Sequence, residues 1–243
     1  MLFRSPETPE FDDTSAAKKE FVSSPMSEFV SVSEAVEMGS KLILIDEEYS
    51  NPCVMRKGFL ADNEKIISLS EMGNSMGRQG ISLVMVSGDE SVIRSADNVL
   101  VVEGFKVSPA KVERTGNGKE FSMPADRYPV SKGIVYEKGH RDVNVTAQEI
   151  RTIEIGEFKV HVPVAALFDI SQTNTVADAI AYMKEHMDGS KNMLDVCKDA
   201  IGAIKAEDDS TDNGSGMHHA TIRAIDLAAV LNRHPQMLAI QKK

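Results

Sequence analysis

The chain has 243 residues, is 42% hydrophobic and 26% charged, and has the composition of a globular protein with one or two domains. Its net charge of −10 argues against wholesale wrapping by nucleic acid, and no apolar run approaches the ~18 residues of a membrane span. Cys53 and Cys197 are too few for a disulfide framework or a cysteine-based zinc site, so a reducing, cytoplasmic setting is expected.

The first part of the chain predicts an irregular lead-in, a helix and a strand. Residues 1–20 are polar and contain proline, without periodicity, so an irregular segment is expected there. A helical pattern follows at 29–36, and Gly39 is a plausible stop for that helix. Four large aliphatic residues then stand in a row within 41–46, which fits a strand buried on both faces in a parallel sheet.

The following patterns alternate between helix and strand. In chain order they are a helix, a strand, a short helix and a strand, at 64–72, 81–86, 90–95 and 98–102. Glycines between the first helix and the strand after it are expected to loosen the chain: Gly73, Gly77 and Gly80. Because strands alternate with helices, the sequence predicts a parallel α/β layer over residues 21–103.

From Gly104 onward the chain changes character. Residues 104–142 hold eight Lys or Arg against five acids, a local charge of +3. Since the net charge of the whole chain is −10, the remaining residues carry a net charge of −13. We expect a basic, loop-rich connector over 104–146. Its cations, with interleaved Phe105, Phe121, Tyr128 and Tyr136, could contact RNA or DNA, and an ordinary solvated loop is the alternative.

Residues 147–243 predict a smaller α+β region. Alternating apolar residues about Gly156 indicate a β-hairpin over 151–162. Thr175 and Asp178 resemble a capping box at the start of a helix, and a second apolar stripe runs from Leu194. The last patterns are a helix at 221–232 and a short strand at 237–240.

The clearest chemical signal follows the first strand. Asp46 and Glu47 stand at its carboxyl end, the edge at which α/β proteins bind ligands. Aliphatic residues followed by Asp-Glu are typical of a Walker B segment, in which Asp46 would hold Mg²⁺ and Glu47 would polarise the water that attacks a γ-phosphate. A buried strand with a solvated acidic turn is the plain alternative. The second strand also ends in a polar stretch, Ser-Gly-Asp at 87–89.

Two other candidate motifs are weak or missing. A P-loop, Gly-x-x-x-x-Gly-Lys-Ser/Thr, would supply the amides and the lysine that hold the β- and γ-phosphates, and no stretch of these residues matches it. The glycine-rich run at 73–80 lacks Gly-Lys-Ser/Thr and precedes a strand. His218 and His219 have no third ligand at a standard spacing, so they are expected to face solvent.

Several short segments, each weak alone, occur in a recognisable order. They are Asp-Thr-Ser at 13–15, Ser-Ser-Pro-Met-Ser-Glu at 23–28, Glu-Ala-Val-Glu-Met-Gly at 34–39, Leu-Ile-Asp-Glu-Glu at 44–48, Ala-Asp-Asn-Val at 96–99, Asp-Ile-Ser-Gln-Thr at 169–173 and Ala-Val-Leu-Asn-Arg at 229–233. Together they resemble the C-terminal half of the bacterial predicted ATPases of the ABC class. A mitochondrial RNA-editing accessory ATPase of kinetoplastids is a relative of that family.

The resemblance implies an α/β fold, with an incomplete ABC-type (P-loop NTPase-like) parallel layer followed by the α+β region. It places Ser23, Ser24 and Ser27 in a signature-like loop and Ser87 at the position of a switch residue. Two departures are notable: Ser24 replaces the family's glycine ahead of a proline, and Glu28 replaces a glutamine.

The resemblance also implies that ATP and Mg²⁺ bind only in a completed site. A P-loop from a partner chain, or a homo-oligomer, would complete it, and ATP hydrolysis would depend on that partner. The alternative is a non-catalytic binding or regulatory protein of the same fold, which could contact RNA or DNA through 104–142.

Overall fold

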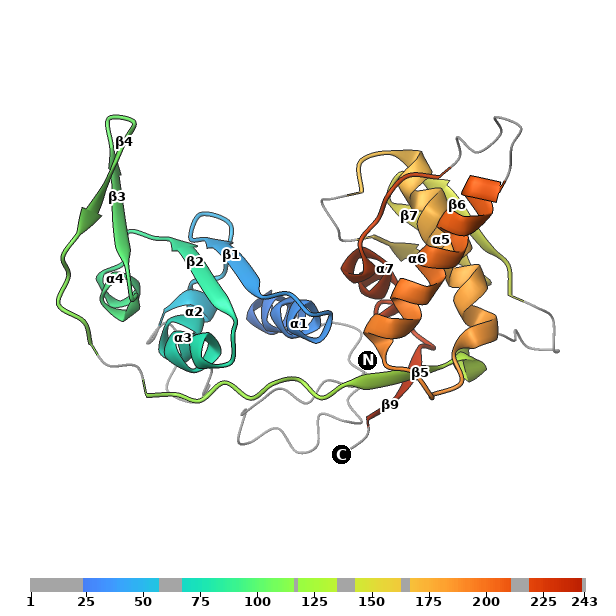
Figure 1. Cartoon of the computed structure of the whole chain (residues 1–243), viewed down its shortest axis with the longest axis horizontal. Coiled ribbons are helices and arrows are strands. Elements are labelled where there is room, and N and C mark those ends of the chain that lie inside the picture. Colours follow the sequence, from blue (N-terminus) through green and yellow to red (C-terminus); the bar gives the residue numbers. More distant parts are fainter. Residues whose placement is uncertain are drawn as a thin grey trace. The chain divides into compact units, whose positions relative to one another are not determined.

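The computed structural model describes residues 24–56, 67–115, 118–134, 143–162, 167–210 and 219–241. They fall into two compact units, Phe3–Pro124 and Ala125–Lys243 (Figure 1). The boundary lies inside the range for which the sequence predicts a connector. The predicted lead-in, residues 1–20, lies outside the described residues.

A two-stranded parallel sheet organises the first unit. β1 (Leu42–Asp46) pairs with β2 (Ser82–Val86), from Leu42 opposite Ser82 to Asp46 opposite Val86. A parallel pair needs a long crossover, and the residues between the strands contain helices. For these two strands the predicted parallel layer is confirmed.

Helices cover one face of this sheet. They are α1 (Ser24–Glu37), the short α2 (Pro52–Met55) and α3 (Leu69–Arg78). Their apolar side chains form one core with the inward residues of the strands: Val32, Val36, Ile43, Ile45, Val54, Met55, Leu69, Met72, Met76, Ile81 and Phe121. Gly39, with φ of +82°, ends α1 as the sequence predicts.

The other face of the sheet is not buried, so the expectation of a strand covered on both faces is wrong. Ile43 and Ile45 are each 8% exposed, whereas their neighbours Leu42 and Leu44 are 53% and 71% exposed. In β2, Val84 and Val86 are 52% and 63% exposed. We call Leu42, Leu44, Val84 and Val86 the outer face. No described helix packs against it, because α1, α2 and α3 all lie on the inner side.

Helix α3 continues through Gly73 and Gly77, so the prediction that these glycines loosen the chain is wrong. Met72 and Met76 are buried on one side of the helix, and that packing outweighs the cost of the two glycines. The backbone adopts a left-handed conformation only afterwards, at Gly80, with φ of +82°.

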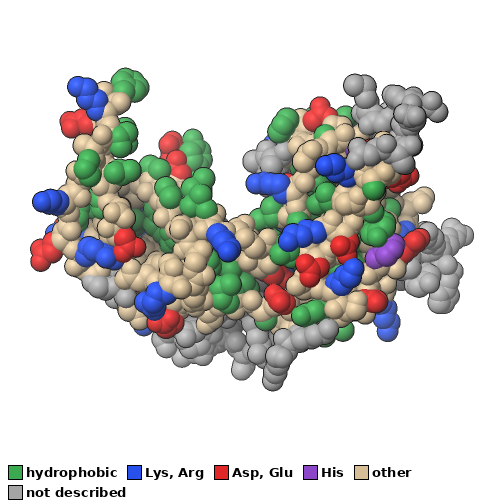
Figure 2. Space-filling model, viewed as in Figure 1, with side chains coloured by type: hydrophobic (Ala, Val, Ile, Leu, Met, Phe, Trp, Pro, Cys, Tyr) green, Lys and Arg blue, Asp and Glu red, His purple; other side chains and the backbone are tan. Residues whose placement is uncertain are grey.

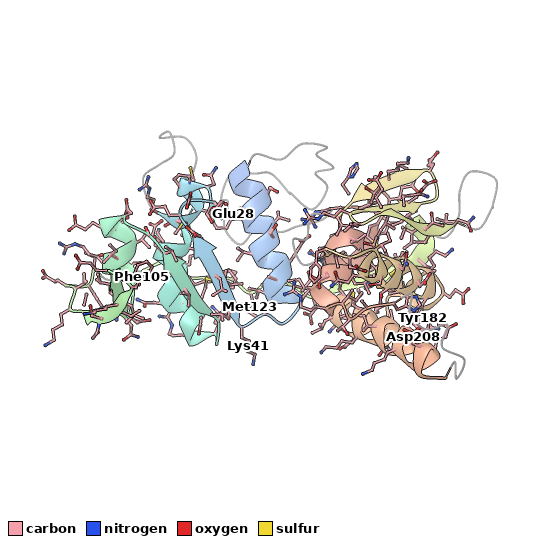
Figure 3. All side chains as sticks on the ribbon, turned by 90° about the horizontal axis from the view of Figure 1, so that it is seen from above. Glu28, Lys41, Phe105, Met123, Tyr182 and Asp208 are labelled. Atoms are coloured by element: carbon pink, nitrogen blue, oxygen red, sulfur yellow. The ribbon has the colours of Figure 1, made fainter. Side chains whose placement is uncertain are left out.

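After α4 (Glu90–Ser95), whose bounds match the prediction, the chain forms a hairpin. β3 (Val99–Glu103) pairs antiparallel with β4 (Lys106–Ala110), so the third predicted strand does not join β1 and β2. The two turn residues, Gly104 and Phe105, have φ of +52° and +61°, as the tightest hairpin turns require. Hydrophobic side chains are among those exposed on the hairpin (Figure 2), and Phe105, labelled in Figure 3, stands fully exposed at its turn.

The second unit contains two antiparallel sheets. β6 (Val145–Glu149), β7 (Thr152–Ile155) and β8 (Phe158–His161) form one, and the predicted hairpin about Gly156 is confirmed as β7–β8. β5 (Arg127–Val130) pairs with β9 (Leu238–Gln241), and the short helical turn η2 (Ser131–Gly133) follows β5. The sequence pattern alone predicts no strands at β4, β5 and the start of β6, because these segments are short, β4 and β5 each contain a proline, and β6 is mostly polar.

Three helices complete the second unit: α5 (Ile170–His186), α6 (Met193–Ser210) and α7 (Ala224–Leu231). Val176, Ile180 and Met183 form the buried side of α5, but the predicted capping box at Thr175 is wrong. Asp169 caps the helix by accepting from Ser171 N at 2.8 Å, and Thr175 Oγ1 bonds Ser171 O at 2.9 Å within it. Among the described helices, none has both the length and the apolarity needed to cross a membrane.

Candidate functional site

Asp46 ends β1 at the carboxyl edge of the parallel sheet. Its carbonyl accepts from Tyr49 N and Ser50 N at 3.1 and 2.9 Å, and its Oδ1 accepts from Glu48 N at 3.0 Å. These bonds close a tight turn directly after the strand. Since Asp46 pairs with Val86, and paired residues of neighbouring strands project to the same side, Asp46 lies on the outer face.

Glu47 begins the turn and is held by the end of β2. Its backbone N donates to Val86 O at 3.0 Å. Its Oε2 accepts from Ser87 Oγ at 2.7 Å and from Gly88 N at 2.8 Å. These hydrogen bonds, with a smaller contribution from the Arg56 charge, lower the pKa of Glu47 against the opposing effect of burial. The structure therefore brings together two predicted site residues, Glu47 and Ser87.

Arg56 and Asp89 form a cluster of charged side chains with Glu47. Arg56 Nη1 lies 3.2 Å from Glu47 Oε1 and 2.8 Å from Asp89 Oδ2. The other oxygen of Asp89, Oδ1, caps α4 by accepting from Ser91 N at 2.9 Å. The hydrogen bond from Ser91 is the largest cause of the lowered pKa of Asp89, which Arg56 lowers further.

Sequence reasoning did not select these two residues. Asp89 stands in a polar stretch that ends a strand and precedes a helix, which was a usable signal for a site residue. Arg56 follows a short helix, nine residues after Glu47, and no motif points to it.

The signature-like segment is described only in part. Ser23 lies outside the described residues, and of Ser24 only the backbone, at the start of α1, is described. Ser27 is exposed, and its carbonyl accepts from Ser31 Oγ at 3.0 Å. The contacts of the described residues do not join Ser27 to Asp46 or Glu47.

Glu28 connects α1 to the turn after Glu48. Its Oε2 accepts from Asn51 N at 2.8 Å, and Asn51 in turn caps α2 by accepting from Cys53 N at 3.1 Å. The acid that replaces the family's glutamine is therefore engaged within the chain, by the backbone N–H of Asn51, which follows Glu47 by four residues.

The acids present fit one kind of metal site. Within the described ranges, no group of three or more His, Cys, Asp or Glu is arranged to hold a metal ion. Mg²⁺ in nucleotide sites is bound by one or two carboxylates together with phosphate oxygens and water, so Asp46 alone is a sufficient protein ligand for that arrangement. His219 is engaged elsewhere, since its Nδ1 and Nε2 each lie 2.7 Å from a carboxylate, Asp208 and Asp178.

The basic residues of 104–142 do not share one role. Arg114 pairs with Asp97 at 2.6 Å, and Arg127 is buried and donates to Asn232 Oδ1 at 2.9 Å. Lys138 and Arg141 lie outside the described residues. Among the described residues, the nucleic-acid alternative therefore rests on four lysines of the segment: Lys106, Lys111, Lys119 and Lys132.

Comparison with family models identifies both parts of the chain. Residues 5–132 match the P-loop domain of ABC_ATPase, and residues 144–239 match the MRB1590 C-terminal domain. No curated protein matches the chain. The first match covers more than half of the chain, and the resemblance predicted from short segments is confirmed. The chain belongs to the ABC_ATPase family and is an ABC-class ATPase-like protein.

Proposed function

We propose that this chain contributes the Walker B and signature-like elements of an ABC-class ATP site, and that a P-loop from another chain completes the site. The observation that carries the proposal is the outer face. It is an apolar surface on a parallel sheet, and the proposed Mg²⁺ ligand, Asp46, stands at its end.

The outer face has the chemistry of an interior surface. Parallel sheets are normally covered on both faces, because the crossovers between their strands place helices there. Here four aliphatic side chains are at least half exposed on a sheet of only two strands. A partner that covers them would bury apolar area and would bring its own groups to the edge where Asp46 and Glu47 stand. This supports a site shared between chains.

The two acids would have distinct roles. Asp46 would bind Mg²⁺, which bridges the β- and γ-phosphates and neutralises the charge that develops on them. Glu47 would accept a hydrogen bond from the attacking water through its carboxylate, whose pKa the hydrogen bonds from Ser87 and Gly88 lower. Ser87 and Gly88 would hold the Glu47 carboxylate by donating to Oε2.

The phosphates need a cradle that these residues do not supply. Backbone amides and a lysine of a P-loop bind them, and no stretch of the 243 residues has that pattern. In this proposal the cradle comes from a P-loop outside these residues.

The test is co-expression with the product of an adjacent gene that carries a P-loop, followed by an ATPase assay of the complex. Glu47→Gln should lower kcat by about 10²–10⁴-fold, the usual contribution of a general base. Glu48→Gln is the matched control, since Glu48 is the next acid and is exposed. If the Glu47 variant keeps full activity in an active complex, the assignment of the base is wrong.

A further inference from the structure

The guanidinium between Glu47 and Asp89 has no role in the site as proposed so far. We propose that Arg56 is a positioning residue for Glu47, and that Asp89 holds Arg56 in place. The inference rests on the proposed function, because it concerns the residue assigned to polarise water. It is carried by one guanidinium nitrogen that lies within hydrogen-bond distance of both carboxylates.

Asp89 is the firmer partner of the arginine. The Arg56–Asp89 contact is 2.8 Å, against 3.2 Å for Arg56–Glu47. Asp89 is itself fixed, because its other oxygen accepts from the first turn of α4. Arg56 is fixed at its backbone, where its N–H donates to Pro52 O at 3.0 Å and ends α2. The arginine therefore reaches Glu47 from a defined direction.

The cluster is less screened than an ordinary surface pair. The side chains of Arg56, Glu47 and Asp89 are 24%, 30% and 23% exposed. Exposed ion pairs on helices contribute little, because water and salt compete for both partners. The Arg94–Glu90 pair on α4, whose acid is 75% exposed, is of that weaker kind and serves as an internal control.

These contacts orient the Glu47 carboxylate. A carboxylate accepts about four hydrogen bonds, and the terminal torsion of glutamate is otherwise loosely restrained. Oε2 accepts from Ser87 and Gly88, and Oε1 accepts from Arg56, which leaves one direction on Oε1 for a water molecule. Without Arg56, Glu47 is held from one side only, and the plane of the carboxylate is free to turn.

The first experiment follows the Gly88 backbone amide by NMR in the purified chain, without nucleotide or partner. Arg56→Gln should shift the Gly88 amide proton upfield, because its bond to Glu47 Oε2 weakens when the carboxylate turns. Asp89→Asn should do the same by releasing Arg56, since asparagine still caps α4. Arg94→Gln should leave the resonance unchanged.

An unchanged Gly88 resonance in folded Arg56→Gln would overturn the proposal, and so would an equal shift in Arg94→Gln. If Arg56→Gln loses the dispersed NMR spectrum of a folded protein, the Gly88 amide is measured in Arg56→Lys instead. A lysine keeps the charge but not the planar fork, so it should give a smaller shift in the same direction. No shift in that variant would also contradict the proposal.

The second experiment measures ATP hydrolysis in the complex with the P-loop-bearing chain. Arg56→Gln should lower kcat by about tenfold or more with KM retained, because positioning acts on the water and not on nucleotide binding. A raised KM at constant kcat, or an unchanged kcat, would refute the positioning role. If the wild-type complex has no activity, the proposed function fails, while the Gly88 resonance still decides whether Arg56 holds Glu47.

Discussion

Neighbouring residues of β1 provide the sharpest test of the uncovered outer face. Leu44 and Ile45 are adjacent, both aliphatic, and point to opposite sides of the sheet. Ile45 is 8% exposed and Leu44 is 71% exposed. Truncation of a buried isoleucine to alanine costs about 2–5 kcal/mol, so Ile45→Ala should lower the free energy of unfolding by that amount.

For Leu44, the expected loss of unfolding free energy on truncation is small. Burial of a whole leucine side chain is worth about 1.5–3 kcal/mol, and about three-tenths of Leu44 is buried, so Leu44→Ala should cost less than about 1 kcal/mol. The assay is urea unfolding of the full chain followed by circular dichroism, with both variants measured in parallel. Equal costs for the two variants would mean that the outer face is covered within the chain, and the reasoning would be refuted.

For binding to the partner chain, we expect Leu44→Ala to have a larger effect than Ile45→Ala. If the P-loop-bearing partner buries Leu44, its truncation should weaken the association by about tenfold or more, which corresponds to at least 1.4 kcal/mol. Ile45→Ala should leave the affinity of the folded protein unchanged. The dissociation constants can be measured by calorimetry, and unaltered binding by Leu44→Ala would show that the partner docks elsewhere.

Two further predictions concern stability. Gly80→Ala should lower the free energy of unfolding by about 1–2 kcal/mol, because φ is +82° there, whereas Gly73→Ala within α3 should raise it by about 0.5–1 kcal/mol. Burial disfavours charge on His219, but hydrogen bonds to Asp208 and Asp178 outweigh it and raise its pKa. The stability that this charge contributes is present below about pH 6.5 and is lost as pH rises through the raised pKa, so the melting temperature should fall over that range and His219→Gln should abolish the dependence.

Elements with a local cause could be predicted from the sequence. Asp89 caps the helix after it, so the bounds of α4 follow from local chemistry alone. Gly156, with φ of +58°, sets the turn of the β7–β8 hairpin between alternating strands. Asp46 and Glu47 were selected from the sequence because aliphatic residues followed by Asp-Glu are a local pattern, and Ser87 was selected because it follows the next strand.

Features that depend on distant packing could not be predicted. Leu42 and Leu44 are as apolar as Ile43 and Ile45, so the pattern is silent on which face of β1 is covered. The continuation of α3 through Gly73 depends on Met72 and Met76 packing into a core shared with α1 and β1. Arg56 joins the site only because α2 brings it beside Glu47 and Asp89, and nothing in the neighbouring sequence predicts that contact.

The proposed function requires that these residues form half of an ATP site. The most direct test is calorimetry of ATP·Mg²⁺ with the purified 243-residue chain and its Asp46→Asn variant, repeated in the presence of the P-loop-bearing partner. We expect no Asp46-dependent binding by the chain alone, and binding that Asp46→Asn abolishes once the partner is present. Binding by the chain alone that is lost in Asp46→Asn would rule out a shared site, because these residues would then form their own phosphate cradle.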